Sequence, residues 1–316
     1  MAAKVHSGED AGSFAQVQAH ALSEALPAAI RARRNIILSS VMVAVVALGI
    51  AFMAIGQGDE GRVLAGFAAG IGAVIVIVLF REIHRRQEMI ILPILCQTLG
   101  LKHKKGEQTF IGRIPSDLIP IGDTQQVDDI ISGSINGHDF SFAELSTYRG
   151  KKLALPVFRG IVIDMCKTNH PELLVAIEEE TQGTPLMPAN VPTEGMDRIG
   201  SFRSASGKLM GLWMPQGAPR QSQGDQAVSA FRQLAIDVQS VLEGAELYSI
   251  RVHGNGFFVA IRMKRDLFRL AGPTADEMQL INSINAMSAD LALPALLAEQ
   301  VVQTNFAYQG RPGMMQ

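Results

Sequence analysis

The sequence predicts an α+β fold in which an N-terminal two-helix transmembrane hairpin precedes a cytoplasmic domain with an antiparallel sheet packed by helices. Two long apolar runs lie close together near the N-terminus, and two Asn-Gly pairs each separate runs of alternating apolar residues. The predicted divisions are a cytoplasmic N-terminal segment at 1–34, the hairpin at 35–86 and the α+β domain at 87–316.

The apolar runs at residues 36–56 and 63–80 are long enough to cross a bilayer. A helix needs about 20 residues to span the roughly 30 Å hydrocarbon core. Each run holds eleven Leu, Ile, Val or Phe residues and no charged residue. This composition gives an insertion free energy of roughly −3 to −7 kcal/mol per helix. A hairpin buried in a soluble core is the alternative, and two such runs around a polar turn at 57–62 favour the membrane.

Arginines on both outer flanks predict the orientation of the hairpin. They are Arg31, Arg33, Arg34, Arg81, Arg85 and Arg86, whereas the turn has one arginine beside two acidic residues. Because cationic flanks stay on the cytoplasmic side, both termini are expected in the cytoplasm and the protein in the cell membrane. Before the first span, residues 13–34 predict an amphipathic helix that lies on the membrane surface or docks on the soluble domain.

Small residues at helical spacing predict a close contact between the two spans. They are Ala65, Ala69, Ala73, Gly66 and Gly70 in the second span, with Ala47 and Ala51 in the first. Packing within the hairpin is favoured, and a homo-oligomer seam is the alternative. The second span is expected to continue as one helix to Gly100, followed by a loop carrying His103, Lys104 and Lys105, for which contact with lipid headgroups is an alternative.

The first Asn-Gly pair, Asn136-Gly137, predicts a β-hairpin with a two-residue turn. This register places Ile131 opposite Phe142 and Gly133 opposite Phe140, with the serines and Asp139 on the other side. The second pair, Asn255-Gly256, predicts a hairpin in which Val252 pairs with Val259, Ile250 with Ile261 and Tyr248 with Met263. Arg251, Arg262 and Ser249 then share a solvated face.

Further elements follow from local patterns. A strand is expected at 153–165 with Pro156 near a sheet edge, and a short helix at 171–180. Residues 181–225 are rich in Pro, Gly, Ser and Gln and predict mostly loop, with strands at 199–203 and 208–214 as candidates. Helices are expected at 226–242 and from Thr274, where Glu277 would complete a capping box.

Several of these motifs together resemble the bacterial domain-of-unknown-function family DUF 3137. The matching positions are Asp129, Ser132, Gly133, Gly137, Phe140, Phe142, Glu144, Val157, Phe158, Gly160, Asp266, Leu267 and Phe268. The resemblance implies a membrane hairpin followed by a cytoplasmic domain and implies no chemistry.

The sequence predicts no catalytic, cofactor-binding or metal-binding residues. Asp164, Cys166 and His170 lie close in sequence, but no second cluster completes a zinc site, and a buried thiol and a loop histidine are favoured. The run 178–180 is expected on a solvated helix face, and Trp213 in core packing rather than at an interface. Arg251 and Arg262 are expected as surface charge, with anion binding as the alternative.

Two functions fit the sequence. The first is a membrane-anchored binding or scaffold module that recruits a protein partner. The second is a membrane-tethered hydrolase whose site combines His138, Asp139 or His170 with a carboxylate of shifted pKa. The absence of a recognisable motif favours the first, and a net charge of −2 makes nucleic acid a poor partner.

Overall fold

The computed structural model divides the chain into two compact units. It describes residues 10–55, 58–106, 108–120, 122–135, 138–150, 156–166, 172–179, 187–188, 195–204, 207–217, 232–233, 245–254, 256–263, 265, 267–268, 270–272 and 275–292. Among the described residues, the helical unit contains 10–99 together with 268–289, and the sheet unit contains 100–267 and 290–292. Residues 268–289 therefore join the helices of the N-terminal part, although they follow the last strand in sequence.

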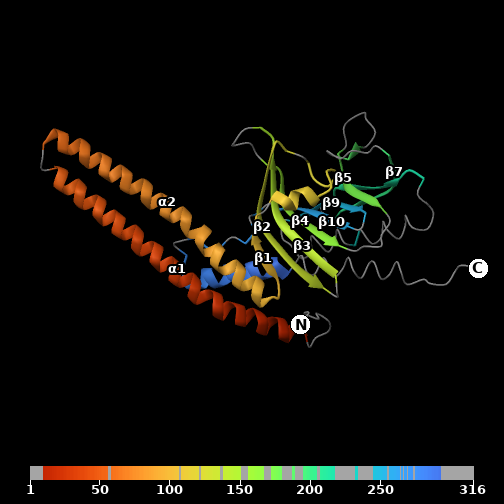
Figure 1. Ribbon diagram of the computed structural model, residues 1–316, viewed down its shortest axis with the longest axis horizontal. Coiled ribbons are helices and arrows are strands. Elements are labelled where there is room, and N and C mark those ends of the chain that lie inside the picture. Colours follow the sequence, from red (N-terminus) through yellow and green to blue (C-terminus); the bar gives the residue numbers. More distant parts are fainter. Residues whose placement is uncertain are drawn as a thin grey trace, which may run out of the picture. The chain divides into compact units, whose positions relative to one another are not determined.

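Two long helices, α1 (Asp10–Ile55) and α2 (Asp59–Thr98), form an antiparallel hairpin (Figure 1). Ala51, Ala54 and Ala65 form a buried cluster between them. A Cβ built on Gly72 would lie 2.6 Å from the Cβ of Ala47, so this glycine lets the two backbones approach closely. The predicted contact within the hairpin is confirmed. Of the small residues predicted in the second span, however, only Ala65 is buried, and Gly66 and Gly70 have open space beside them.

The helices are longer than the predicted elements. The amphipathic segment and the first span are one continuous helix, and the second span continues as α2 to Thr98, as predicted. Gly100 follows with φ +73°, a conformation that suits a helix C-terminus. The predicted polar turn at 57–62 is too long, because α2 already begins at Asp59. Asp59 and Glu60 in its first turn interact favourably with the helix dipole.

A further helix covers residues 277–292 in the described part of the chain. Its capping box lies elsewhere than predicted: Asp276, not Thr274, is the N-cap. Asp276 Oδ1 accepts from the Gln279 N–H at 2.7 Å, and Gln279 Oε1 accepts from the Asp276 N–H at 3.1 Å. This helix buries one apolar stripe, formed by Leu280, Ile284, Met287 and Leu291.

The sheet unit is built on an antiparallel sheet with nine strands in a continuous path. The strands are β1 (Lys102–Lys105), β2 (Thr124–Ile135), β3 (His138–Tyr148), β4 (Pro156–Cys166), β5 (Leu173–Glu179), β6 (Met187–Pro188), β7 (Met196–Arg203), β8 (Leu209–Pro215), β9 (Ala245–His253) and β10 (Gly256–Met263). The order is β1-β2-β3-β4-β10-β9-β5-β8-β7, and β6 pairs with β5 off this path. The β9–β10 hairpin thus lies in the middle of the sheet, although it is the last to be synthesised.

The first hairpin has the predicted register. Ile131 pairs with Phe142, Gly133 with Phe140, and Ile135 with His138. A Cβ on Gly133 would lie 2.9 Å from the Phe140 ring, so the aromatic side chain covers this glycine, as predicted. The turn Asn136-Gly137 itself lies outside the described residues. β2 begins at Thr124, and its pairing with β3 has a register shift between Val127 and Ile130.

The predicted register of the second hairpin is wrong by two residues. Phe257 pairs with Val252 and Val259 with Ile250, because the turn begins at Gly254, which has φ +58°. A shift of two residues preserves which face each side chain points to. A further register shift after Ala260 places Ile261 opposite Leu247 instead of Ile250.

One other prediction is wrong. Residues 173–179 form the inner strand β5 instead of a helix, since the run is buried on both faces and paired on both sides. Pro156 begins β4, and the first residues of this strand pair only with β3, because the pairing with β10 starts at Gly160, which agrees with the predicted position of Pro156 near a sheet edge. The candidate strands within 181–225 are confirmed as β7 and β8. Of the predicted helix 226–242, the structure describes only residues 232–233, which are helical.

The two faces of the sheet differ in chemistry. One face, here called the apolar face, carries a fully buried row across neighbouring strands: Ile131, Phe142, Ile163, Val259, Ile250, Val175 and Leu212. The opposite face, here called the polar face, carries the row displaced by one residue: Ser141, Asp164, Phe258, Arg251, Leu174 and Trp213.

Candidate functional site

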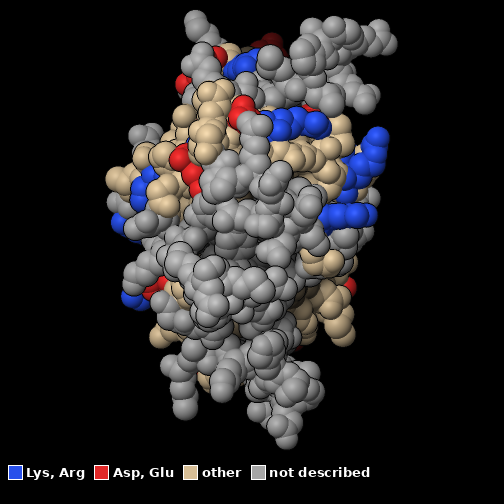
Figure 2. Space-filling model, turned by 90° about the vertical axis from the view of Figure 1, so that its right-hand side faces the viewer, with Lys and Arg blue, Asp and Glu red and all other residues tan. Residues whose placement is uncertain are grey.

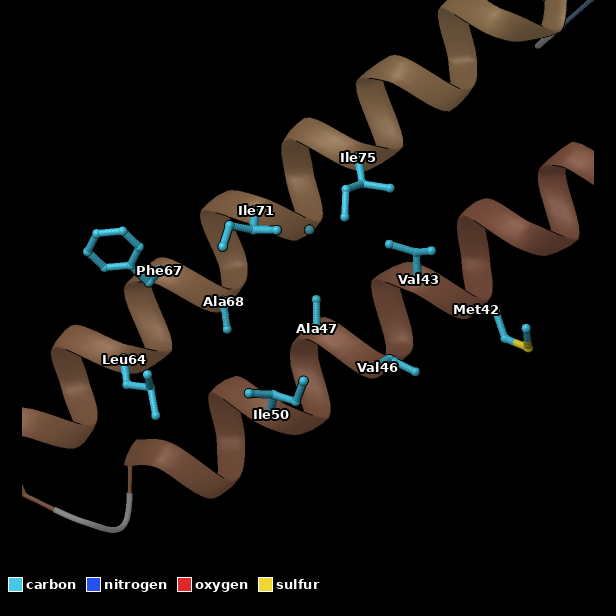
Figure 3. A pocket seen from close by; sticks show the side chains of 11 residues that line it. Met42, Val43, Val46, Ala47, Ile50, Leu64, Phe67, Ala68, Ile71 and Ile75 are labelled. Atoms are coloured by element: carbon cyan, nitrogen blue, oxygen red, sulfur yellow. The ribbon is translucent and has the colours of Figure 1, made fainter.

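The helical unit has two helices that are long and apolar enough to cross a membrane, Ser23–Ile55 and Asp59–Leu79. Their large apolar side chains are exposed: Phe52 is 81% and Phe67 69% accessible. A groove of about 520 Å³ runs between them and is lined only by apolar residues, with Ala47, Ala68 and Gly72 between larger side chains (Figure 3). Such a surface suits a hydrocarbon solvent and offers no polar group for catalysis.

The basic cluster after α2 does not lie in the predicted loop. His103 and Lys105 belong to β1, whose residues pair with β2. His103 Nε2 lies 2.7 Å and Lys105 Nζ 3.1 Å from Asp129 Oδ1. Burial alone would raise the pKa of Asp129, but the hydrogen bond with His103 and the charge of Lys105 outweigh it and lower the pKa. His103 and Lys105 thus have an internal partner in the sheet.

Glu144 is a carboxylate within the apolar face. It follows Phe140 and Phe142 at every second position of β3, so it points to the same face, and it is only 9% exposed. Burial raises the pKa of Glu144 to about 7, and the charges of Asp128 and Asp129 act in the same direction. Arg159 and a hydrogen bond from the Leu267 N–H partly oppose this rise.

Arg251 is the centre of an ion network on the polar face. Its Nη2 donates to Glu172 Oε1 at 2.8 Å, and its Nη1 donates to the Leu173 carbonyl at 3.2 Å. Arg251 Nε lies 2.8 Å from Asp117 Oδ2, but its N–H is not directed at an acceptor, so this contact is an ion pair. Arg251 was predicted as surface charge, but its guanidinium group is buried and paired with Asp117 and Glu172. Because these carboxylates already occupy it, Arg251 is a poor site for an anion.

The network extends to the surface through His253. Its Nδ1 lies 2.9 Å from Glu172 Oε1, and its side chain is 63% exposed. The hydrogen bond with His253 lowers the pKa of Glu172, and Arg251 adds to this effect. A carboxylate that orients an imidazole in this way is one part of the arrangement used in general base catalysis.

The segment 108–120 covers part of the polar face. Phe110 and Leu118 are buried, and Ser249 Oγ donates to the Leu118 carbonyl. Arg113 lies over the Phe110 ring and 3.5 Å from Asp164. Burial raises the pKa of Asp164, although Arg113 partly offsets it. Ser249 and Arg251 are thus buried, and the predicted solvated face of the second hairpin is wrong.

Glu178 also differs from its prediction. It is not on a solvated helix but on β5, where its side chain is fully buried beside Arg198 of β7. Arg198 Nε and Nη2 donate to the two carboxylate oxygens at 2.7 and 3.0 Å. Trp213 packs with Leu174 and Ala176, which confirms core packing for the single tryptophan.

No group of three metal-ligating side chains occurs among the residues that the structure describes. Asp164 and Arg113 form an ion pair, whereas the Cys166 side chain and His170 are outside the described part, so this cluster stays untested. His138 and Asp139 begin β3 beside the hairpin turn. Sequence reasoning missed Glu144, Asp117, Glu172 and the His253 contact. Only Glu144 had a local signal, since its spacing from Phe140 and Phe142 placed a charge at a core position.

No family model, curated protein or solved structure matches the chain. The resemblance to DUF 3137 therefore stays a hypothesis that rests on the motifs alone.

Proposed function

We propose that the protein is a membrane-anchored binding or scaffold module whose sheet unit recruits a protein partner at the bacterial inner membrane. The observation that carries this proposal is the distribution of exposed apolar surface. Among the described residues, every exposed large apolar side chain belongs to α1, α2 or the helix at 277–292, and none belongs to the sheet. The surface of the two long helices is therefore suited to contact with lipid, and the surface of the sheet unit is suited to contact with water.

The surface of the sheet unit suits polar recognition. Figure 2 shows Lys and Arg together with Asp and Glu on the described part of the face that it presents. Mixed charges favour partner selection through electrostatic complementarity over a purely apolar contact. Anchoring would add to such binding by raising the local concentration at the membrane.

The proposed orientation places both termini in the cytoplasm. It rests on the arginine-rich flanks of the hairpin, against Arg62 alone in the turn, where Arg62 pairs with Asp59 at 3.0 Å. In this orientation the sheet unit faces the reducing cytoplasm, and the two cysteines are thiols.

Affinity purification from detergent-solubilised membranes tests the binding proposal. The full chain is expected to retain a specific protein that a matched bait, the hairpin of residues 1–99 alone, does not retain. Reverse purification with the identified partner is expected to recover the full chain. If neither direction yields a specific protein under mild crosslinking, the scaffold proposal is wrong.

The alternative is a membrane-tethered hydrolase. The contact between Glu172 and His253 favours it, because it orients an exposed imidazole. A panel of ester, amide and phosphoester substrates, applied to the wild type and to His253→Ala, tests this function. Turnover that disappears in the variant supports the hydrolase, whereas turnover unaffected by it excludes His253 as the base.

A further inference from the structure

The arginines of the sheet unit differ in their partners. Four of them each pair with an acidic side chain: Arg113, Arg198, Arg251 and Arg265. Arg262 of β10 has no acidic partner within the part of the chain that the structure describes, where its contacts are the ring of Tyr248 and the Val157 carbonyl. Arg262 thus keeps hydrogen-bond donors that no acidic side chain of this part occupies.

The Arg262 guanidinium group is held on the polar face of the sheet. Arg262 lies four residues after Phe258 on a strand without a bulge, so it points to the same face. Its guanidinium carbon lies 4.7 Å from the centre of the Tyr248 ring, which packs edge-to-face on Phe158 with ring centres 5.4 Å apart. Both aromatic side chains are buried. Stacking on a ring restricts the guanidinium plane and leaves its N–H edge for hydrogen bonds.

The N–H edge of Arg262 is only partly used. One Nη2–H donates to the Val157 carbonyl at 3.5 Å, which is long for a hydrogen bond. The residue opposite Arg262 on β4 is Gly160, which places no side chain beside it. Arg262 itself is half-buried and reaches solvent. A carboxylate that approaches this edge can therefore accept two parallel N–H bonds.

The surrounding charges favour a carboxylate over a phosphate group. Glu246 lies opposite Arg262 on β9, and its Oε2 accepts from Lys208 Nζ at 2.8 Å. Lys208, Glu246 and Arg262 together carry one net positive charge. A carboxylate matches this charge. A phosphate group, with a charge of about −1.5 to −2 at pH 7, exceeds it and is repelled more strongly by Glu246.

We propose that Arg262 binds a carboxylate side chain in an acidic segment of the partner protein. This inference rests on the proposed function, because it names the chemistry of the partner that the sheet unit recruits. The Arg262 guanidinium donates two hydrogen bonds to the carboxylate, and Tyr248 holds the guanidinium plane. Charge-assisted pairs of this kind supply geometric specificity as well as affinity.

A dye-labelled tetraglutamate peptide tests this inference, with binding to the full chain in zwitterionic micelles measured by fluorescence anisotropy. The wild type is expected to bind tetraglutamate at least about tenfold more tightly than tetraglutamine. Arg262→Gln is expected to weaken tetraglutamate binding about tenfold, because the charge-assisted pair is lost. Arg262→Lys keeps the charge but not the planar fork of donors, so an intermediate loss is expected.

Arg203→Gln is the matched control. It removes the same charge from an exposed arginine of β7, whose guanidinium donates to the Gly207 carbonyl. Its affinity for tetraglutamate should equal that of the wild type, and an equal loss in both glutamine variants overturns the assignment to Arg262. A wild type that binds tetraglutamate no more tightly than tetraglutamine overturns the inference whether or not the variants fold.

Free acetate distinguishes an acidic segment from a small carboxylate. Acetate at the carboxylate concentration of the peptide is expected to leave the peptide bound. Complete displacement by acetate overturns the acidic segment as the ligand in favour of a free carboxylate.

The inference and the proposed function fail in different ways. If affinity purification yields a specific partner and Arg262→Gln retains it as well as the wild type does, the carboxylate site is wrong and the scaffold function stands. If no partner is recovered while tetraglutamate binding depends on Arg262, the scaffold function is wrong and the site for an acidic segment stands.

Discussion

At the scale of single residues, the described part of the sheet unit places most of its buried charges in contact with an opposite charge. Asp129, Glu178 and Arg251 each have one or two such partners. Glu144 differs from these residues, because the nearby carboxylates of Asp128 and Asp129 disfavour its charged form, which Arg159 favours. Removing one member of a buried pair leaves the other without compensation, which makes these residues informative sites for mutation.

Asp129→Asn is expected to destabilise the protein by about 1 to 3 kcal/mol at pH 7, because His103 and Lys105 lose their charged acceptor. In the folded protein the pKa of Asp129 lies below its ordinary value. Asp129 therefore stabilises the fold fully at a pH above the ordinary pKa, and this stabilisation is lost as the pH falls through the pKa of the folded protein. Chemical denaturation should therefore show the two proteins converging below about pH 4. Asp128→Asn removes a neighbouring charge at a half-buried position, which accepts from Gln126, and is the control, for which a smaller effect is expected.

Gly211→Ala is expected to destabilise the sheet unit by about 1 to 3 kcal/mol, through overpacking. A Cβ at this position would lie 2.1 Å from the Trp213 ring and 2.3 Å from Glu178 Oε1. Tryptophan fluorescence during denaturation reports this directly, since Trp213 is the single tryptophan. Gly112→Ala has open space and is the matched control. Equal stability of the two variants would contradict the packing described around Trp213.

At the scale of elements, the Asn-Gly rule predicted the register of one hairpin correctly and of the other wrongly. The register of the first hairpin followed from the turn and the alternation of Phe140 and Phe142. The second hairpin failed because its turn contains two candidate glycines, and Gly254, not Gly256, is used. The strand β5 was missed because a short run that is apolar on both faces has no period to distinguish strand from helix. Its pairing with β8 and β9 is decided by tertiary contacts.

The ion networks could not be predicted either, because tertiary contacts decide which charged residues meet. Asp117, Glu172 and Arg251 are far apart in sequence and meet only because β5 lies beside β9 and the segment 108–120 covers the polar face. Only a charge at a core position of a confidently registered strand, such as Glu144, is visible beforehand.

Gly72→Leu is expected to weaken the helical hairpin, because the added side chain meets Ala47 at the closest approach of α1 and α2. Gly70→Leu is the control, since this position is open. Thermal unfolding in one detergent is expected to show a lower midpoint for Gly72→Leu alone. A lower midpoint for Gly70→Leu than for Gly72→Leu would mean that α2 contacts α1 through the face that carries Gly66 and Gly70.

Asp276→Ala is expected to lower stability by about 1 kcal/mol, because the capping box of the helix at 277–292 loses its acceptor. Glu277→Ala tests the cap position predicted from sequence and should have a smaller effect. Chemical denaturation followed by circular dichroism compares the two. A larger loss for Glu277→Ala would contradict Asp276 as the N-cap.

At the scale of the whole molecule, the proposed orientation makes a prediction about accessibility. A protease cleavage site inserted next to Gly58 should be cut in spheroplasts from the outside, whereas a site at the end of the chain after Gln316 should be cut only after lysis. Fractionation should recover the full chain with membranes after an alkaline carbonate wash. Recovery of a monodisperse protein without detergent would exclude the membrane anchor and, with it, the proposed function.

The return of residues 268–289 to the helical unit has a consequence for biosynthesis. A ribosome that has made the two long helices still has to make every strand of the sheet before it reaches Leu280 and Ile284. The helical unit is therefore completed only after the described strands of the sheet have been synthesised. A nascent chain stalled just before residue 268 would lack the buried stripe of Leu280, Ile284, Met287 and Leu291, and its helical unit would be incomplete.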